Sequence, residues 1–269
     1  MRWRTKTAVP LHAKVLQWVH EAARSSHPMD TPAGPKANRL LAALPDDAFA
    51  RWLPALEAVD MPPGLVIYEP GQELRYVHFP VTSIVTLQVV LENGNTTEIA
   101  VVGLEGLVGI SAFMGGRTAS NRAIVQVAGR GFRMAARIVR DEFHARPAVT
   151  GLLLRYAQAA ITQMAQTAVC NRHHSVAQQL CRLLLLCRER LPDDEIALTH
   201  ESIAGMIGVR REGVTAAARA LQAAGIIRYT RGHIRVLDRA GLERLSCECY
   251  GVVRNEYGRL LPGTPGERP

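Results

Sequence analysis

Cysteine is absent from the first 169 residues of this 269-residue chain. The five cysteines that follow are Cys170, Cys181, Cys187, Cys247 and Cys249. This odd number, and a start that lacks the apolar core and small-residue cleavage site of a secretory signal, argue against a disulfide-stabilised secreted protein. We therefore expect a cytoplasmic protein with reduced thiols.

Long apolar runs are also lacking, and aromatic residues make up only 5% of the chain. The longest aliphatic run, Leu183–Leu186, is far shorter than the roughly 18 residues of a transmembrane helix, so we expect no membrane partner. Hydrophobic residues at 48% and charged residues at 21% are typical of globular proteins and exclude wholesale disorder. The length corresponds to one large domain or two modest ones.

Lysine is scarce, and almost all of the 32 basic residues are arginines. The 24 acidic residues leave a net charge of +8, which is distributed unevenly. Residues 1–29 carry +4, residues 30–198 are neutral, and residues 199–240 carry +4 because seven arginines face three acids. A short basic block is typical of a nucleic-acid-binding module, although a solvated basic face gives the same count.

The periodicity of the apolar residues changes along the chain. Residues 1–36 form an extension, with a basic amphipathic helix at 9–23 and Met29 as an alternative start. A helical pattern covers 38–56, and short apolar runs separated by turn residues then predict an antiparallel roll. The expected strands are 65–68, 76–79, 84–91, 98–102, 123–128 and 132–135, with turns at 69–71, 92–95 and 129–131.

From Pro147 the pattern is helical for more than forty residues. A first helix of some 25 residues is long for a single globular domain, which indicates a core helix or a dimer seam. We expect the seam, because the helix is too long to be buried by its own roll. The predicted seam residues are Tyr156, Ala160, Met164 and Thr167.

Residues 199–224 carry the most specific motif, a helix-turn-helix. Thr199 is placed to cap the first helix, and Gly208 permits the turn that follows it. The second helix begins at Arg210-Arg211-Glu212, which leaves these side chains at its exposed start. Arginine can bond guanine with two hydrogen bonds, and glutamate can accept one from cytosine. Two short apolar runs, 226–229 and 234–237, flank the turn Thr230-Arg231-Gly232 and form a wing.

Together these motifs resemble the Crp/Fnr family of bacterial transcription regulators. The resemblance covers about residues 38–250 and is most specific in the DNA-binding segment. It implies an α+β fold with an N-terminal cyclic-nucleotide-binding-like jelly roll, a long dimerisation helix and a C-terminal winged helix-turn-helix. The corresponding segments are an extension at 1–36, a roll at 37–146, the long helix at 147–174, a DNA-binding domain at 175–250 and a tail at 251–269.

The resemblance also implies a set of DNA-contacting residues. The family's base-reading pair corresponds to Arg211 and Glu212, and its phosphate-contacting residue corresponds to Thr199. Two positions depart from the family pattern: Arg210 replaces a capping Ser or Thr, and Ala216 replaces a further base-reading Arg of the cyclic-AMP-responding members. The expected DNA-binding residues are Thr199, Arg210, Arg211, Glu212, Thr215, Arg219 and Arg231.

One stretch of the roll corresponds to the ligand pocket of the family's cyclic-nucleotide binders. Cyclic-nucleotide binders hold the ribose with a Glu and the phosphate with an Arg, whereas this chain has Ile110 at the former position and a displaced Arg122 at the latter. We therefore expect no cyclic nucleotide, and a different small anion remains an alternative. The candidate pocket residues are Gly109, Ile110, Gly115, Gly116, Asn121 and Arg122.

Other cofactors find little support in the sequence. An iron–sulfur sensor of the family's type needs thiolates near the N-terminus, where there are none. His78 and His144 are lone histidines, which are more often surface or core residues than haem ligands. Cys247 and Cys249 could bind a metal with His233, but packing is the preferred interpretation, so we expect neither a metal nor a cofactor. Cys170 beside His173-His174 could be a nucleophile, yet no orienting acid is evident, and we expect no enzyme.

The sequence thus predicts a homodimeric regulator that binds double-stranded DNA at an inverted repeat and works with RNA polymerase. The alternative is a sensor module in which the roll binds a small molecule and the helix-turn-helix contacts another protein.

Overall fold

A computed structural model of the chain describes residues 34–94, 96–192 and 194–261. The basic helix predicted at 9–23, the alternative start at Met29 and the end of the tail, residues 262–269, lie outside these ranges. Among the described residues, none of the helices is long and apolar enough to cross a bilayer.

Short helices precede the roll: η1 (Pro35–Ala37), α2 (Arg39–Ala42), α3 (Asp46–Trp52) and η2 (Leu53–Ala55). The predicted helix at 38–56 is therefore interrupted, because Pro45 occupies the N-cap position of α3. Asn38 caps α2 by accepting a hydrogen bond from the amide of Leu41. Its side-chain amide donates to the carbonyls of Pro80 and Gly106, which ties α2 to the roll.

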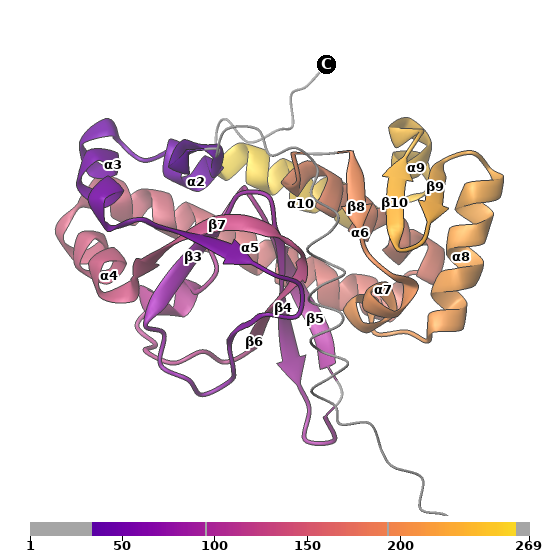
Figure 1. The fold of residues 1–269 in the computed structure, drawn as a ribbon, viewed down its shortest axis with the longest axis horizontal. Helices are drawn as coiled ribbons and strands as arrows, with labels where there is room; N and C mark the ends of the chain where they lie inside the picture. Colours follow the sequence, from indigo (N-terminus) through magenta and orange to yellow (C-terminus); the bar gives the residue numbers. More distant parts are fainter. Residues whose placement is uncertain (1–33, 95, 193, 262–269) are drawn as a thin grey trace, which may run out of the picture. The chain divides into compact units, whose positions relative to one another are not determined.

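The roll consists of two antiparallel sheets (Figure 1). Its strands are β1 (Glu57–Met61), β2 (Val66–Tyr68), β3 (Tyr76–Pro80), β4 (Ile84–Val90), β5 (Thr96–Val102), β6 (Arg122–Val127) and β7 (Gly129–Ala135). One sheet has the order β1-β7-β3, and the other has the order β2-β6-β4-β5. A short helix, η3 (Ile110–Ala112), follows β5, and α4 (Ala136–Ala145) follows β7. The predicted fold class, an α+β chain with an antiparallel N-terminal roll, is confirmed.

The sequence predicted a turn at 129–131 and no strand at 57–61, but these two segments pair with each other as parts of β7 and β1. The turn expected at 129–131 is the start of β7, where Gly129 pairs with Met61 of β1. A Cβ atom on Gly129 would lie 2.4 Å from the backbone of Thr82, so glycine permits close strand packing here. Strand β1 has no regular alternation of apolar and polar residues, so the sequence did not reveal it. Its Glu57 and Asp60 form exposed ion pairs with Arg133 and Arg130 of β7.

The long helix α5 (Pro147–His173) packs against the roll with the face predicted to be the dimer seam. Tyr156 is 1% exposed and donates a hydrogen bond to the carbonyl of Leu107. Ala160 and Thr167 are also buried within the chain, and Met164 packs against the core. The seam assignment is therefore wrong: this face of α5 is covered by its own roll and by a C-terminal helix that the sequence pattern did not reveal.

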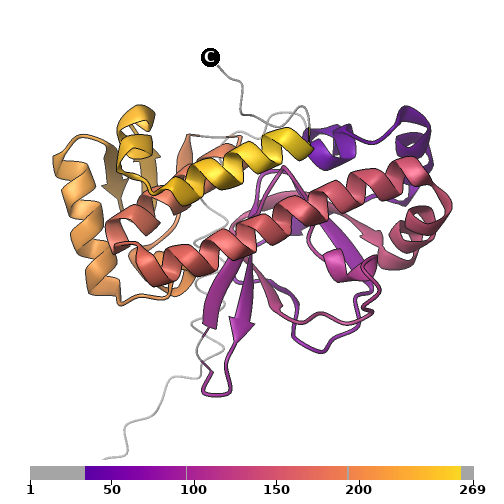
Figure 2. The same ribbon diagram turned by 180° about the vertical axis from the view of Figure 1, so that it is seen from behind.

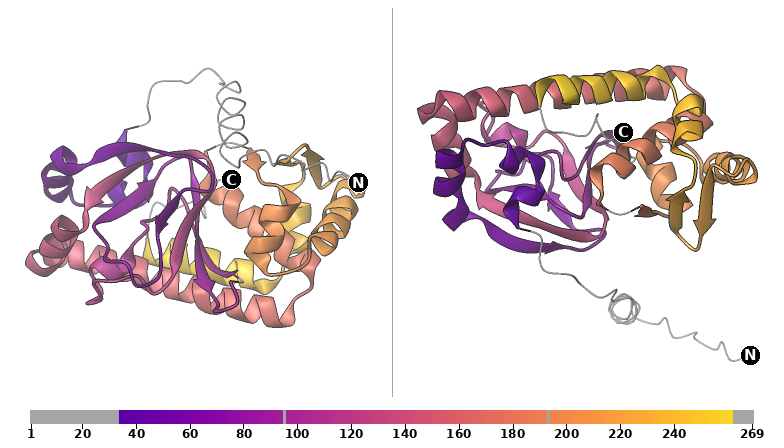
Figure 3. Two further views of the ribbon diagram at one scale, coloured as in Figure 1. Left: turned by 60° about the horizontal axis from the view of Figure 1, so that its bottom comes forward. Right: turned by 90° about the horizontal axis from the view of Figure 1, so that it is seen from above.

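The C-terminal half begins with α6 (Val176–Arg190) and β8 (Glu195–Ala197). It continues with α7 (His200–Ile207), α8 (Arg211–Ala223), β9 (Ile227–Thr230), β10 (His233–Val236) and α9 (Arg239–Leu245). The last helix, α10 (Glu248–Leu260), lies alongside α5 (Figures 2 and 3). Residues 251–260, expected to belong to a tail, are thus helical, and Arg155 of α5 donates to the carbonyl of Leu260.

A buried polar junction joins the roll to α6. The guanidinium of Arg190, at the end of α6, lies 2.6 Å from the Glu105 carboxylate and 2.6 Å from the Gln163 side-chain oxygen of α5. Both charged side chains of this pair are about 95% buried. Gln163 in turn donates to the carbonyl of Val101 in β5, so that three segments meet at one ion pair.

Candidate nucleic-acid interface

The helix-turn-helix consists of α7, α8 and the tight turn between them. Thr199 caps α7, because its hydroxyl accepts a hydrogen bond of 3.1 Å from the amide of Ser202. The helix ends at Gly208, whose φ of +70° is a left-handed conformation that favours glycine. Ile203 and Val214 are fully buried between the two helices. The predicted turn is therefore present at the predicted position.

Helix α8 presents a hydrophilic face with both signs of charge. Arg211 and Glu212 are exposed in its first turn, and Arg219 is exposed two turns later. The side chain of the N-cap residue Arg210 accepts no hydrogen bond from the first turn of α8. The backbone amides of this turn can therefore donate to a group outside the helix. An open hollow of the surface is lined by Arg211, Glu212, Thr215, Ala216 and Arg219.

The arginine at the start of α8 is only loosely held. Its Nε lies 3.9 Å from a carboxylate oxygen of Glu201, and both side chains are more than 60% exposed. An exposed ion pair of this length contributes little free energy. The Arg211 guanidinium can therefore exchange this partner for a nucleic-acid base at small cost.

His200 links α7, α8 and the wing, and it was not among the residues predicted from the sequence. Its ring stacks on Tyr229 of β9, with centroids 4.2 Å apart and 22° between the planes. Its Nδ1 lies 3.0 Å from the Thr215 hydroxyl of α8. Burial and the nearby charges of Arg211 and Arg219 lower the pKa of His200, which favours the neutral ring at neutral pH. No sequence signal marks it, since the contact joins residues 29 positions apart.

The wing is a three-stranded sheet with the order β8-β10-β9, one strand more than predicted. The turn at its tip lies where it was predicted but is shorter by one residue, because Thr230 belongs to β9. The backbone has a φ of +47° at Arg231 and +87° at Gly232. Arg231 is exposed there, together with Arg228 and Arg235 on the two strands. The exposed basic side chains of the wing and of α8 account for the charge of residues 199–240.

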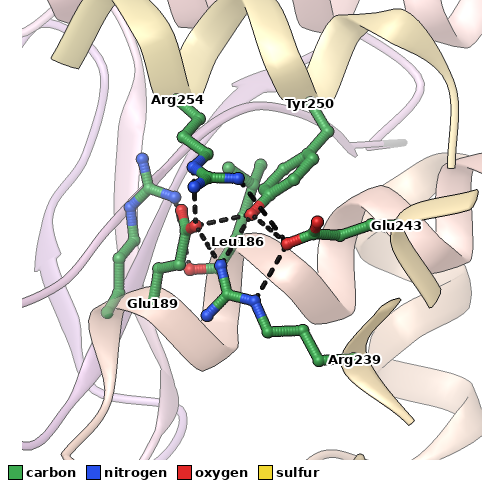
Figure 4. A network of polar contacts seen from close by, with 7 residues as sticks. Leu186, Glu189, Arg239, Glu243, Tyr250 and Arg254 are labelled. Carbon is green, nitrogen blue, oxygen red and sulfur yellow. Dashed lines mark hydrogen bonds and ion pairs between the residues drawn. The ribbon is translucent and has the colours of Figure 1, made fainter. Parts of the chain in front are cut away.

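A polar network connects the winged segment to the C-terminal helix (Figure 4). Glu189 of α6 accepts hydrogen bonds from the Tyr250 hydroxyl at 2.5 Å and from Arg239 at 3.0 Å. Arg239 also donates to Glu243 of α9, and Arg254 of α10 lies within 4.0 Å of both glutamates. Burial, and then the charge of Glu189, raise the pKa of Tyr250. This network holds α6, α9 and α10 together.

The candidate ligand residues of the roll lie on the loop between β5 and β6 and at the first residue of β6. Ile110 packs against the core at the start of η3, and Arg122 of β6 is paired with Glu69 at 2.8 Å. Asn121 has a buried side-chain oxygen without a hydrogen-bond partner. Gly115 and Gly116 are exposed, whereas Gly109 is buried. The positive charge expected to hold an anion is thus already neutralised.

A hollow of about 360 Å³ opens elsewhere on the roll, lined by residues of β2, β3 and the loop between them. Its lining includes Tyr68, Arg75 and His78. The Nδ1 atom of His78 is buried without a partner, and burial with the charge of Arg133 lowers its pKa to about 4. His144, the other lone histidine, is exposed beside Phe143.

The histidine proposed as a companion of the C-terminal cysteines is placed differently from the expectation. His233 pairs with Glu195 across the wing at 2.8 Å. Cys247 and Cys249 instead gather with Cys170 and His174.

Comparisons with known proteins agree with this geometry. Residues 178–245 match the sequence model of the Crp-like helix-turn-helix domain. No curated protein sequence matches the chain significantly. Among solved structures, FixK2 from Bradyrhizobium japonicum is similar with a TM-score of 0.63 and 17% identity, covering 71% of this chain and 98% of that protein.

Two further solved structures have the same fold. A putative Crp/Fnr-family transcriptional regulator from Eubacterium rectale has a TM-score of 0.59 and 16% identity, covering 78% of this chain and 98% of the other. The regulator CLP from Xanthomonas campestris, described as responsive to c-di-GMP, has a TM-score of 0.56 and 13% identity, covering 71% and 99%. The resemblance predicted from the sequence is confirmed in the helix-turn-helix and in the fold.

Proposed function

The chain carries a Crp-like helix-turn-helix domain within the fold of the Crp/Fnr regulators, and from this premise we propose that it is a transcription regulator that binds an inverted-repeat operator as a homodimer. The observation that carries the proposal is the exposed first turn of α8, where Arg211 and Glu212 extend from a helix held by a capped partner helix. A recognition helix reads bases with its N-terminal residues, which matches this arrangement. Contact with RNA polymerase is part of the same proposal.

The dimer contact belongs on the other face of α5. Leu154 and Ile161 are 49% and 46% exposed, although both are large and apolar. With the exposed Ala165 and Ala168 they recur at intervals of seven, four and three residues, the spacing of a coiled-coil seam. Figure 2 views α5 from this uncovered side. A second copy of the chain, related by a two-fold axis, would bury the same stripe on both helices.

DNA binding by this dimer is proposed to be independent of cyclic nucleotides. A buried ribose needs an acceptor and a buried phosphate needs a cation. Ile110 supplies no acceptor, and Arg122 is already paired with Glu69. These features also disfavour the hypothesis that the roll has a preformed binding site for a cyclic nucleotide.

The proposal is tested by titrating the purified full-length protein against labelled duplexes selected from a random pool, at several salt concentrations. We expect selection of an inverted repeat and an affinity that falls steeply as salt rises, because phosphate contacts release counterions. A protein that selects no sequence, or whose duplex binding does not respond to salt, would overturn it in favour of a protein-contacting module.

A further inference from the structure

Four side chains with metal-binding atoms gather where α5 ends and α10 begins. Cys170 and His174 come from the last turn and the C-cap of α5, and Cys247 and Cys249 come from the N-cap and first turn of α10. The four ligand atoms all lie within 4.8 Å of one another. The three cysteines are at most 5% exposed, and the His174 side chain is 13% exposed.

The spacing of these atoms fits a tetrahedral zinc ion. Zinc–sulfur bonds of about 2.3 Å and zinc–nitrogen bonds of about 2.0 Å place neighbouring ligand atoms about 3.5 to 3.8 Å apart. The Sγ atoms of Cys170 and Cys247 are 3.6 Å apart, and Cys249 Sγ lies 3.6 Å from His174 Nδ1. An ion would draw the most distant pair together by only about 1 Å.

The surroundings of the cluster are also those of a metal centre. The Nε2 atom of His174 lies 3.3 Å from a carboxylate oxygen of Glu248, which leaves Nδ1 facing Cys249. Metal-bound histidines almost always donate their second ring N–H to such a partner. Arg182 of α6 is buried, and its Nη2 bonds the Thr167 hydroxyl one turn before Cys170. Its Nε has no hydrogen-bond partner.

We propose that Cys170, His174, Cys247 and Cys249 bind a zinc ion. The thiols release their protons to solvent when they coordinate, which leaves three thiolates around a doubly charged ion. The resulting negative charge is compensated by the nearby guanidinium of Arg182. Four protein ligands leave no open position for a substrate, so the site is structural rather than catalytic.

The ion would join two segments that flank the DNA-binding domain in sequence. Residues 175–246, which contain α7, α8 and the wing, form a loop between the two ligand pairs. A disulfide between Cys170 and Cys247 would close the same loop, but it would leave Cys249, His174 and the orienting Glu248 without a role. Zinc coordination uses all of them.

The experiment uses the full-length protein purified without added metal or chelator. We expect about one zinc ion per chain by elemental mass spectrometry. After zinc removal, titration with cobalt(II) should give the visible absorption of a tetrahedral complex and a near-ultraviolet thiolate-to-cobalt band. Cys249→Ser and His174→Ala should lose most of the bound zinc. Glu248→Gln should weaken zinc affinity about 10- to 100-fold, since it removes only the partner of a ligand.

Two matched variants serve as controls. Cys187→Ala removes a fully buried thiol that lies outside the cluster, and His173→Ala removes the exposed neighbour of His174. Both should retain full zinc content. The cobalt spectrum of the unmutated protein keeps the test decisive if a ligand variant fails to fold. An unmutated protein that contains no zinc and gives only the weak spectrum of hydrated cobalt would overturn the proposal, as would a Cys170–Cys247 disulfide in the freshly purified chain.

Discussion

The imidazole of His200 is stacked on the ring of Tyr229 and bonded to the Thr215 hydroxyl, so one side chain fixes the start of α7 to both α8 and the wing. We predict that His200→Ala weakens binding to all duplex sequences alike, because it loosens the two DNA-facing elements without removing a base contact. His200→Phe should restore part of the affinity through stacking alone. Fluorescence anisotropy on specific and unrelated duplexes measures both. His233→Ala, at an exposed wing histidine, is the control; equal losses in the two alanine variants would contradict the prediction.

We propose that Arg211 reads a base. Arg211→Ala should cost about 1–3 kcal/mol per half-site and relax specificity at one position of the operator. Competition binding against duplexes with each base substituted in turn measures this effect. In contrast, Thr199→Ala should weaken binding to every sequence by removing the cap of α7, and Thr199→Ser should retain it. An unchanged operator preference in Arg211→Ala would show that α8 docks differently.

The dimer seam proposed on the exposed face of α5 is tested by Ile161→Glu. Two carboxylates would face each other across an apolar contact, which is strongly unfavourable. Sedimentation velocity should then show monomers, and operator affinity should fall because a single recognition helix contacts only one half-site. Leu53→Glu, at a similarly exposed leucine of η2, should leave the dimer intact. A dimer that survives Ile161→Glu places the contact elsewhere.

Stability should depend on pH through Glu98 of β5. Burial raises the pKa of this carboxyl from 4.5 to about 8, and the facing charges of Arg182 and Arg190 lower it only partly. The folded state therefore retains a proton that the unfolded chain releases, so this group makes the free energy of unfolding fall as pH rises from about 4.5 to about 8. The loss is of the order of a few kcal/mol.

Glu98→Gln keeps the shape of the side chain but cannot ionise. Denaturant unfolding at several pH values should show the variant gaining stability relative to the unmutated chain as pH approaches 8. The difference between the two should stop changing below about pH 4.5, where Glu98 is protonated in the folded and in the unfolded chain. Parallel pH curves would show that Glu98 is ionised in the folded protein.

Cyclic AMP is expected to bind no more tightly than about millimolar, because its phosphate would have to displace Glu69 from Arg122. Calorimetry with the full-length protein measures the affinity. A micromolar affinity that is lost in Arg122→Ala would show that this pair opens to admit a nucleotide.

Local signals predicted much of this structure. Most strands of the roll, although not β1, and the turns at Gly208 and Arg231-Gly232 follow from alternation and from residues that tolerate positive φ, which are properties of neighbouring residues. The exposed position of Arg211 followed from the same motif. These features are encoded within about 25 residues and need no knowledge of distant contacts.

Features that depend on contacts between residues far apart in the chain could not be predicted from the sequence. The apolar pattern of α5 could not show which side faces its own roll, because Tyr156 is buried by a bond to Leu107 rather than by a partner chain. Likewise, Cys170 and Cys247 are 77 positions apart, and no spacing rule pairs them. His200 was missed for the same reason, since Tyr229 reaches it only after the wing has folded.

The Arg190–Glu105 pair has a consequence for dissecting the protein into parts. A cut between the roll and α6 would separate the Arg190 guanidinium from the Glu105 carboxylate and expose to solvent the surfaces that bury the pair. Removing one member of such a pair commonly costs about 3–5 kcal/mol, a large fraction of a domain's total stability. The boundary at which periodicity changes in the sequence is therefore not a place to truncate the chain. The roll and the C-terminal segment are expected to unfold in a single transition, and the isolated C-terminal segment is expected to be less stable than the same segment in the full chain.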